Sequence, residues 1–319
     1  MQKKPRKLHG GDIYRHPDVI DFSVNTNPLG TPESVKRAVQ ESVAKIEHYP
    51  DVRCEALREA ISRFEQVNME EILCGNGAAE LFFAAVQAVW PQKALVIAPS
   101  FSEYEEALRS VGAEVEYYYL CEEDNFQIRE DYVDKLAEEI DMIFLCNPNN
   151  PTGQTIDRDM LIKILDRCKK QNIVVILDEC FLEFLDEPNR YEMSDLRGEY
   201  PNLLIIKAFT KIFSMPGLRL GYAISSNQDI LEEMSWKLQQ WNVSAQMAGV
   251  AALEKPKEYI RQTREYVSGQ REYMRNIMKM MGYVVFASKA NYLFFKGRPG
   301  LEKEALEAGF LIRDCQNYE

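Results

Sequence analysis

Residues 173–178 have the sequence IVVILD, in which five consecutive apolar residues end in the carboxylate Asp178. The run is β-branched and apolar on both faces, which is typical of a strand buried in a parallel sheet with helices on both sides. Similar apolar runs occupy residues 94–98, 115–120, 142–146, 203–206 and 220–224. Helical periodicity separates them at residues 78–89, 104–111, 132–139 and 158–170.

This alternation predicts an α/β fold with a mainly parallel sheet in a three-layer large domain at residues 45–228. We expect a smaller α+β domain that combines residues 1–44 with residues 229–319. Thr31 precedes Pro32 and Glu33, which predicts a helix start with the Thr31 hydroxyl as its N-cap. The small domain would contain helices at 228–241, 258–281 and 301–308 and a strand at 292–295. In such folds, ligands bind beyond the carboxyl ends of the strands.

Composition excludes several classes of protein. The 319 residues include 50 acidic and 38 basic side chains, and the net charge of −12 opposes nonspecific binding to nucleic acid. No run approaches the roughly 20 apolar residues of a membrane span, and the basic start is not followed by the apolar core of a secretory signal. The seven Cys and three His lack metal-ligand spacing, so we expect free thiols, no metal site and a cytoplasmic location.

A lysine stands between apolar residues in the sequence AFTKIFSMPGLR at 208–219. The ordinary interpretation of Lys211 is a surface residue whose aliphatic stem covers apolar neighbours. The functional interpretation is a partly desolvated amine, which is nucleophilic near neutral pH. Arg219 follows a Pro-Gly turn, which allows it to return a permanent charge to the same place.

Three other stretches lie where strands are expected to end. Asp178 is either a helix cap or salt-bridge partner, or a buried carboxylate that faces a pyridinium nitrogen. Residues 147–153, NPNNPTG, either terminate a strand or fix an Asn amide at the ligand-binding edge. Residues 75–80, GNGAAE, offer a phosphate site at a helix N-terminus, whereas in a dinucleotide fingerprint Glu80 would replace the third glycine.

The order of these stretches resembles the fold-type I enzymes that use pyridoxal 5′-phosphate (PLP), within the class I/II aminotransferase superfamily. The similarity runs from about His9 to the end of the sequence. Further shared motifs are NPLG at 27–30, YPD at 49–51 and the pair Asp178-Glu179.

The resemblance implies a role for each matching residue. Lys211 would form a Schiff base with PLP and shuttle protons, Asp178 would pair with the pyridine nitrogen, and Asn150 would lie near the phenolic oxygen. Phe101 would stack on the cofactor ring, an apolar contact that needs no hydroxyl. The implied phosphate ligands are Ala78, Ala79, Thr210, Arg219 and, from a neighbouring subunit, Tyr49. The role of Tyr49 implies a homodimer with shared active sites.

Two subfamilies are similar to this sequence: the threonine-phosphate decarboxylases of cobalamin biosynthesis and the histidinol-phosphate aminotransferases. The HGGD start at 9–12, the lysine motif at 210–222, and Phe181 in place of a usual Tyr favour the decarboxylases. That resemblance implies decarboxylation of O-phospho-L-threonine to 1-aminopropan-2-yl phosphate, with transamination of the histidinol-phosphate type as the alternative. The implied substrate contacts are His9, Gly10, Asn25 and Asn150.

Two positions depart from the family pattern. Ala208 stands where a Ser or Thr often contacts the cofactor phosphate, so one hydrogen bond is expected to be missing. Relatives continue beyond Glu319 into a strand whose arginines bind the substrate carboxylate, and Arg313 does not match them. We therefore expect a truncated chain that retains cofactor binding and has reduced turnover. A PLP-fold binding protein or inactive fragment stays open as the non-enzyme alternative.

Overall fold

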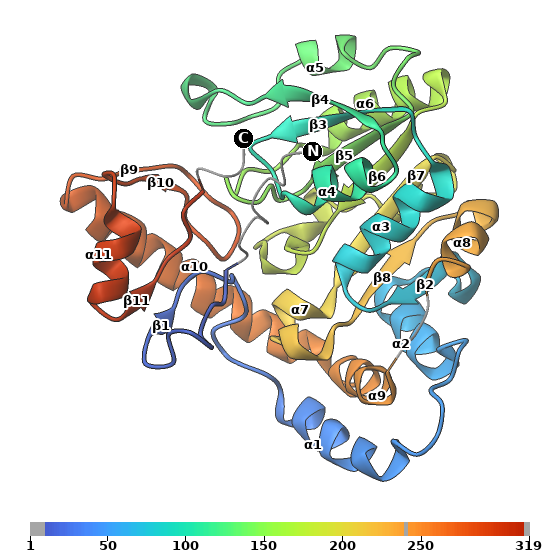
Figure 1. The fold of residues 1–319 in the computed structure, drawn as a ribbon, viewed down its shortest axis with the longest axis horizontal. Coiled ribbons are helices and arrows are strands. Elements are labelled where there is room, and N and C mark those ends of the chain that lie inside the picture. Colours follow the sequence, from blue (N-terminus) through green and yellow to red (C-terminus); the bar gives the residue numbers. More distant parts are fainter. Residues whose placement is uncertain (1–9, 239–241, 316–319) are drawn as a thin grey trace.

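The computed structural model describes residues 10–238 and 242–315 (Figure 1). In this part of the chain, a seven-stranded sheet has the order β2-β8-β7-β6-β5-β3-β4. The strands are β2 (Ile72–Gly75), β3 (Lys93–Ala98), β4 (Glu114–Tyr119), β5 (Met142–Cys146), β6 (Val174–Asp178), β7 (Leu203–Ala208) and β8 (Gly221–Ile224). Strands β3 to β7 pair in parallel, which confirms the predicted mainly parallel sheet.

One end of the sheet is antiparallel, because β8 runs opposite to both β7 and β2. The connection from β7 to β8 holds only the short helices α7 (Phe209–Ile212) and η7 (Pro216–Leu218). A parallel crossover usually contains a long helix, whereas this connection has none, and the chain returns beside β7 in the opposite direction. The run at 220–224 is therefore a strand as expected, but of opposite direction.

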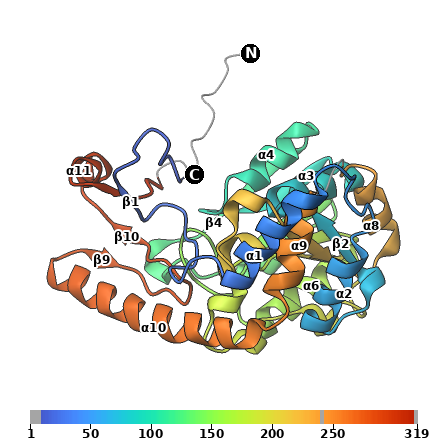
Figure 2. The same ribbon diagram turned by 90° about the horizontal axis from the view of Figure 1, so that it is seen from below.

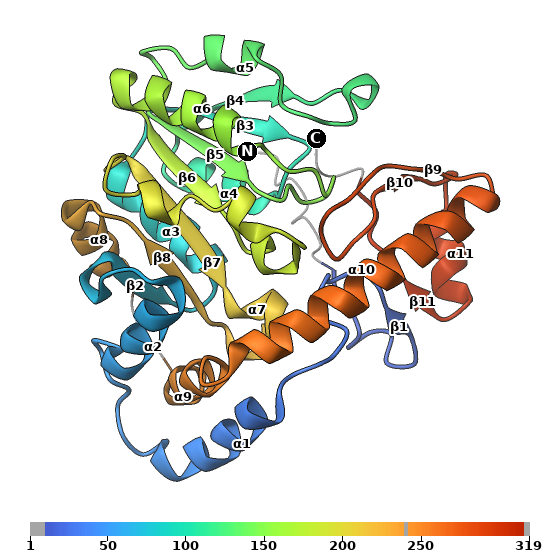
Figure 3. The same ribbon diagram turned by 180° about the vertical axis from the view of Figure 1, so that it is seen from behind.

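Two helical layers cover the sheet. Helices α3 (Ala78–Val89), α4 (Glu103–Ser110) and α8 (Gln228–Ser235) lie on one face (Figure 1), and α2 (Glu55–Glu65), α6 (Arg158–Gln171) and α9 (Val243–Ala252) lie on the other (Figure 3). Successive side chains of a strand point to opposite faces. In β7, Leu204 and Ile206 accordingly pack in the core beneath α3, whereas Leu203 and Ile205 pack in the other core.

The remaining elements lie beside this three-layer body. Helix α1 (Glu33–Ser42) packs against α9, and the long helix α10 (Pro256–Met280) extends from α9 to the far side of the molecule (Figures 2 and 3). Strand β1 (Ile20–Asp21) pairs in parallel with β11 (Phe310–Leu311), and β9 (Val284–Val285) pairs with β10 (Phe295–Lys296). Helix α11 (Leu301–Glu307) precedes β11. The division at residues 44 and 228 stays a prediction.

Three local predictions were wrong. The stretch 132–139 is helical only over α5 (Asp131–Asp134), because Leu136 and Ala137 donate to carbonyls three and two residues back. The strand expected at 292–295 covers Phe295 and Lys296 instead. The hydroxyl of Thr31 does not cap α1 but donates to the carbonyl of Ser214 at 2.6 Å.

Two expectations about the whole chain were also tested. All seven cysteines are free thiols, and five of them are buried. Within residues 10–238 and 242–315, no helix has the length and apolar character needed to cross a membrane.

Helix α8 ends at Ser235, earlier than the helix predicted at 228–241, of which residues 239–241 lie outside the described residues.

Candidate active site

Three sequence stretches meet where the parallel strands end. Asp178, the last residue of β6, pairs with Cys146 of β5 and Ile206 of β7. The Asn-rich turn at 147–153 follows β5, and Lys211 follows β7 by three residues. The carboxyl ends of parallel strands are the usual ligand edge of an α/β sheet. The fold therefore gathers the predicted lysine, aspartate and Asn turn at one edge.

Lys211 is the third residue of α7 and is partly buried. Its Nζ donates to the carbonyl of Val24 at 2.7 Å and lies 5.4 Å from the ring centre of Phe181. Burial lowers the pKa of this amine, Asp178 opposes that shift, and the positive charge of Arg219 adds to it. A lowered pKa raises the fraction of uncharged, nucleophilic amine, as the functional interpretation requires.

The N-terminal segment holds α7 in place. Asn27 donates its backbone N–H to the carbonyl of Lys211 at 3.0 Å and its side-chain amide to the carbonyl of Ile212 at 2.8 Å. The NPLG motif at 27–30 therefore fixes the backbone that carries the lysine.

Asp178 is almost completely buried, with 4% of its surface exposed. Its Oδ2 accepts a hydrogen bond from the hydroxyl of Tyr104 at 2.5 Å, and its Oδ1 accepts from the N–H of Cys180 at 2.9 Å. Burial raises the pKa of this carboxyl, and the two donors oppose the rise. Sequence analysis did not identify Tyr104; the available signal was its position three residues after Phe101.

The start of α3 and Arg219 lie close together and form a candidate anion site. Gly77 has a φ of +94°, and a Cβ there would lie 2.7 Å from Nη2 of Arg219. Gly221 also approaches this turn, since its Cβ would lie 2.9 Å from the backbone nitrogen of Ala78. The first N–H groups of a helix lack partners within the helix and attract anions. Ala78 and Ala79 begin α3 and supply such groups.

Glu80 modifies this anion site. Its carboxylate accepts from the backbone N–H of Asn76 at 2.6 Å and from the Asn76 side-chain amide at 3.0 Å. The Asn76 amide is thus bound within the turn. Glu80 stabilises the turn in the place where a dinucleotide fingerprint would have its third glycine.

The remaining predicted residues occupy different positions. Phe101 contacts Tyr104 edge-on with ring centres 5.7 Å apart, and Asn150 lies in the Asn turn, partly buried. Asn25 has a φ of +52° and its carbonyl accepts from Asn291, which ties it to the C-terminal segment. Gly10 packs on the backbone of Ser23. Thr210 is partly buried in α7, and Ala208 is buried at the end of β7. Arg313 lies after β11.

Two predicted site residues do not lie with the others at the carboxyl edge of the sheet in the described chain. The side chain of Tyr49 is 96% exposed in the single chain, as a residue that acts on another subunit would be. His9 lies outside the described residues.

The donor groups fit PLP. The amine of Lys211, whose pKa is lowered by burial, suits an aldehyde. The buried carboxyl group of Asp178 suits a protonated ring nitrogen, and the start of α3 with Arg219 suits a phosphate. The absence of a side chain at Gly77 allows the guanidinium of Arg219 to lie close to the start of α3. Across the described residues, no group of metal-ligating side chains is arranged to hold a metal ion.

The family model described as aminotransferase class I and II matches residues 17–317. The chain belongs to this family. Its members are PLP-dependent enzymes, so the chain is an enzyme of a PLP-dependent family.

Within this family, the chain is similar to two kinds of enzyme. The chain is 35% identical to threonine-phosphate decarboxylase of Salmonella typhimurium, over 97% of this chain and 88% of that protein. It is 34% identical to histidinol-phosphate aminotransferase of Desulfitobacterium hafniense, over 99% of this chain and 89% of that protein. The solved structure of histidinol-phosphate aminotransferase from Clostridium acetobutylicum matches with a TM-score of 0.86 and 30% identity, over 93% of this chain and 90% of that one.

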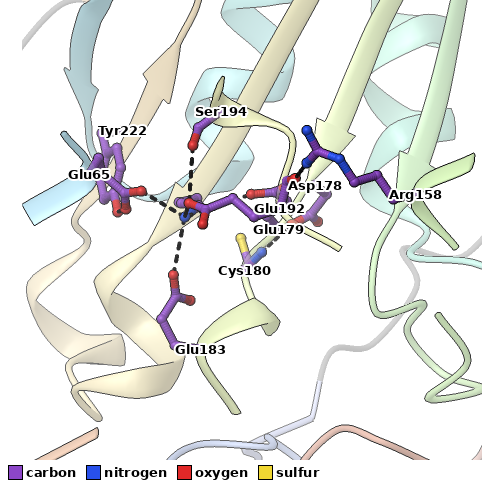
Figure 4. Close-up of polar contacts among 10 residues, drawn as sticks. Glu65, Arg158, Asp178, Glu179, Cys180, Glu183, Glu192, Ser194 and Tyr222 are labelled. Carbon is purple, nitrogen blue, oxygen red and sulfur yellow. Dashed lines mark hydrogen bonds and ion pairs between the residues drawn. The ribbon is translucent and has the colours of Figure 1, made fainter. Parts of the chain in front are cut away.

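A second charged cluster surrounds Lys207 of β7, and Figure 4 shows its carboxylates Glu65, Glu179, Glu183 and Glu192. Lys207 alternates with Leu204 and Ile206 along β7, so it lies on the face of the sheet away from α3. Lys207 is 3% exposed, and its Nζ is surrounded by carboxylates. The distances from Nζ are 2.8 Å to Glu65, 3.2 Å to Glu183, 3.5 Å to Glu192 and 3.7 Å to Glu179. Tyr222 donates a short hydrogen bond to Glu65. We name this set the Lys207 cluster; it joins the end of α2 to the segment after β6.

The Lys207 cluster was missed by sequence analysis, although a lysine in an otherwise apolar strand was a visible signal. Burial raises the pKa of Glu65 and Glu179, whereas the surrounding carboxylates raise that of Lys207 against the effect of burial. Within the described residues, neither carboxyl oxygen of Glu179 has a hydrogen-bond partner. An open cavity of about 510 Å³ adjoins the cluster.

Proposed function

We propose that this chain decarboxylates O-phospho-L-threonine to 1-aminopropan-2-yl phosphate, with PLP attached at Lys211. The observation that carries the proposal is the meeting of Lys211 and Asp178 at one sheet edge, in a chain 35% identical to a threonine-phosphate decarboxylase. When bound, PLP supplies a ring that accepts the electron pair of a broken bond at the substrate Cα.

Lys211 and Asp178 carry the reactive roles. The lowered pKa of Lys211 increases the share of uncharged amine, which would attach the cofactor carbonyl. When CO₂ leaves, Cα gains one proton in place of the carboxylate, and Nζ of Lys211 is its source. Asp178 would bind a protonated ring nitrogen, because its carboxylate accepts two hydrogen bonds from fixed donors and can still accept a third.

Binding groups complete the proposed site. The N–H groups of Ala78 and Ala79, the Thr210 hydroxyl and the Arg219 guanidinium would hold the cofactor phosphate. Phe101 would stack on the ring, and Asn150 would hydrogen-bond its phenolic oxygen. The substrate contacts in this proposal are His9, Gly10, Asn25 and Asn150.

The proposal includes a homodimer in which Tyr49 of each subunit reaches the cofactor phosphate of the other. The near-complete exposure of Tyr49 supports this role, since the residue packs on almost nothing in its own chain. A cytoplasmic location is also part of the proposal, supported by seven free thiols, which persist in a reducing compartment.

Transamination of the histidinol-phosphate type is the second candidate, favoured by the TM-score of 0.86 to such an enzyme. Both reactions begin at the same lysine and differ in whether CO₂ or a proton leaves Cα. Phe181, a ring without a hydroxyl, lies 5.4 Å from Nζ of Lys211 and favours the decarboxylase, because the aminotransferases usually have a Tyr there.

The test incubates PLP-loaded protein with O-phospho-L-threonine in the absence of a keto acid, and measures CO₂ and 1-aminopropan-2-yl phosphate. Equimolar, sustained release of both, lost in Lys211→Ala, is the expected result. Conversion of the cofactor to its amine form without CO₂, together with turnover of histidinol phosphate and a keto acid, would establish the second candidate. A protein that neither reacts nor changes its spectrum with either substrate would overturn both.

A further inference from the structure

Tyr104 connects the two groups that would contact the cofactor ring. It is the second residue of α4, and its side chain is completely buried. Its ring stacks on Phe144 at 4.9 Å and meets Phe82 edge-on at 5.0 Å. These contacts fix the ring so that its hydroxyl reaches Oδ2 of Asp178 at 2.5 Å. Rotation of the hydroxyl away from Asp178 would leave a buried donor without a partner, which is costly.

The carboxylate of Asp178 is therefore fixed from both sides. The Tyr104 hydroxyl binds Oδ2, and the N–H of Cys180 binds Oδ1 at 2.9 Å. A carboxylate has about four lone-pair sites, so two remain for a ligand. Two fixed donors determine the direction in which those remaining sites point.

The same tyrosine also supports Phe101. The two rings meet edge-on, with centres 5.7 Å apart and planes at 82°. Phe101 is the residue expected to stack on the cofactor, while Asp178 is expected to bind its edge. The buried side chain of Tyr104 thus contacts both the residue proposed to stack on the cofactor ring, Phe101, and the residue proposed to bind its nitrogen, Asp178.

We propose that Tyr104 is a positioning residue for the cofactor, which keeps Asp178 charged and oriented toward the ring nitrogen and holds Phe101 against the ring. This inference rests on the proposed function. It adds a residue on α4, a helix that supplies none of the other residues of the proposed site.

The groups that face Asp178 explain why the hydroxyl matters. They are Tyr104 from α4, Cys146 from β5, Cys180 after β6 and Lys211 from α7. Burial is the largest influence and raises the pKa of Asp178, whereas Tyr104, Cys180 and Lys211 act against it. Burial also raises the pKa of Tyr104 well above its usual value, so the phenol remains a donor at physiological pH.

The test is a pH titration of the absorption spectrum of PLP-loaded wild type, Tyr104→Phe, Asp178→Asn and the double variant. Without the hydroxyl, the pKa of Asp178 rises and the ring nitrogen loses its proton. A cofactor ring without that proton would carry no positive charge, so it would no longer oppose protonation of the Schiff base at Lys211. We expect the spectral transition of Tyr104→Phe to move up by about one pH unit, which corresponds to a tenfold change in proton affinity.

The double variant separates positioning from packing. If Tyr104 acts through Asp178, Tyr104→Phe adds no further shift in the Asp178→Asn background. An equal shift in both backgrounds, or no shift in the wild-type background, overturns the inference. Tyr118→Phe is the matched control, since Tyr118 also donates to an aspartate, Asp131, at 2.6 Å, and it should leave the transition unchanged.

Two further measurements keep the result interpretable. If Tyr104→Phe fails to fold, Tyr104→His restores an N–H donor on a flat ring and should titrate close to the wild type; a shift as large as in Asp178→Asn would overturn the inference. A wild-type spectrum identical to that of Lys211→Ala would instead mean that the proposed function has failed. The two failures are therefore distinguishable.

Discussion

Gly77 and Arg219 are in contact across the start of α3: a Cβ at Gly77 would lie 2.7 Å from Nη2 of Arg219. Both residues adopt positive φ angles, +94° for the glycine and +55° for the arginine. The absence of a side chain at residue 77 therefore allows a guanidinium to approach the first N–H groups of α3. This pair shapes the candidate anion site in which the proposed cofactor phosphate would lie.

Gly77→Ala is expected to weaken PLP binding about tenfold or more, because the methyl group displaces Arg219 and the backbone is strained at positive φ. The dissociation constant is measured by absorbance titration of apoprotein. Gly112→Ala is the matched control, since Gly112 has a φ of +81° with no atom within 4 Å of its Cβ position. Equal loss of PLP affinity in both variants would mean that strain alone, and not the contact with Arg219, matters.

Lys207→Met should destabilise the protein by about 3–5 kcal/mol near neutral pH, because it leaves buried carboxylates without their cation. The free energy of unfolding is measured by urea denaturation. Lys163→Met, which removes a surface ion pair with Glu130, should cost about 1 kcal/mol or less. Similar losses in the two variants would contradict a special role for the Lys207 cluster.

Glu179→Gln should change how stability depends on pH. Burial raises the pKa of Glu179 well above 4.5, so the folded state binds this proton more tightly than the unfolded state does. The contribution of Glu179 to stability is therefore largest below the unfolded pKa and declines as pH rises toward the folded pKa. The free energy of unfolding of Glu179→Gln, relative to wild type, should rise over that interval and then level off. A constant difference across the interval would exclude a raised pKa.

Mixed dimers test the role of Tyr49. Tyr49→Ala and Lys211→Ala homodimers should each have little activity, whereas a hybrid has one site with both residues intact. Co-expression in equal amounts should restore about a quarter of wild-type decarboxylation, since half of the dimers are hybrids with one active site each. No recovery, with hybrids demonstrated by a tag on one subunit, would mean that Tyr49 acts in its own subunit. A fully active Tyr49→Ala homodimer would mean that Tyr49 has no role.

Local sequence was sufficient to predict most of the sheet. Strands β3, β5, β6 and β7 begin and end within two residues of the predicted runs, because apolar runs and strand-ending polar residues are local properties. The prediction of a helix at 132–139 was wrong because it relied on the spacing of apolar residues alone. Tyr132, Leu136 and Ile140 are all buried at helical spacing, but tight turns meet that requirement as well as a helix does.

The sequence by itself determined the order of strands and helices and the positions of Asp178 and Lys211, because strand ends and a desolvated lysine are visible in neighbouring residues. Only the tertiary structure decided what surrounds them. Tyr104 and Asp178 are 74 residues apart, and Lys207 and Glu65 are 142 apart, so no local pattern reports either pair. Such contacts form because packing buries polar groups that must then find partners, and the partners come from distant segments that the sheet brings together.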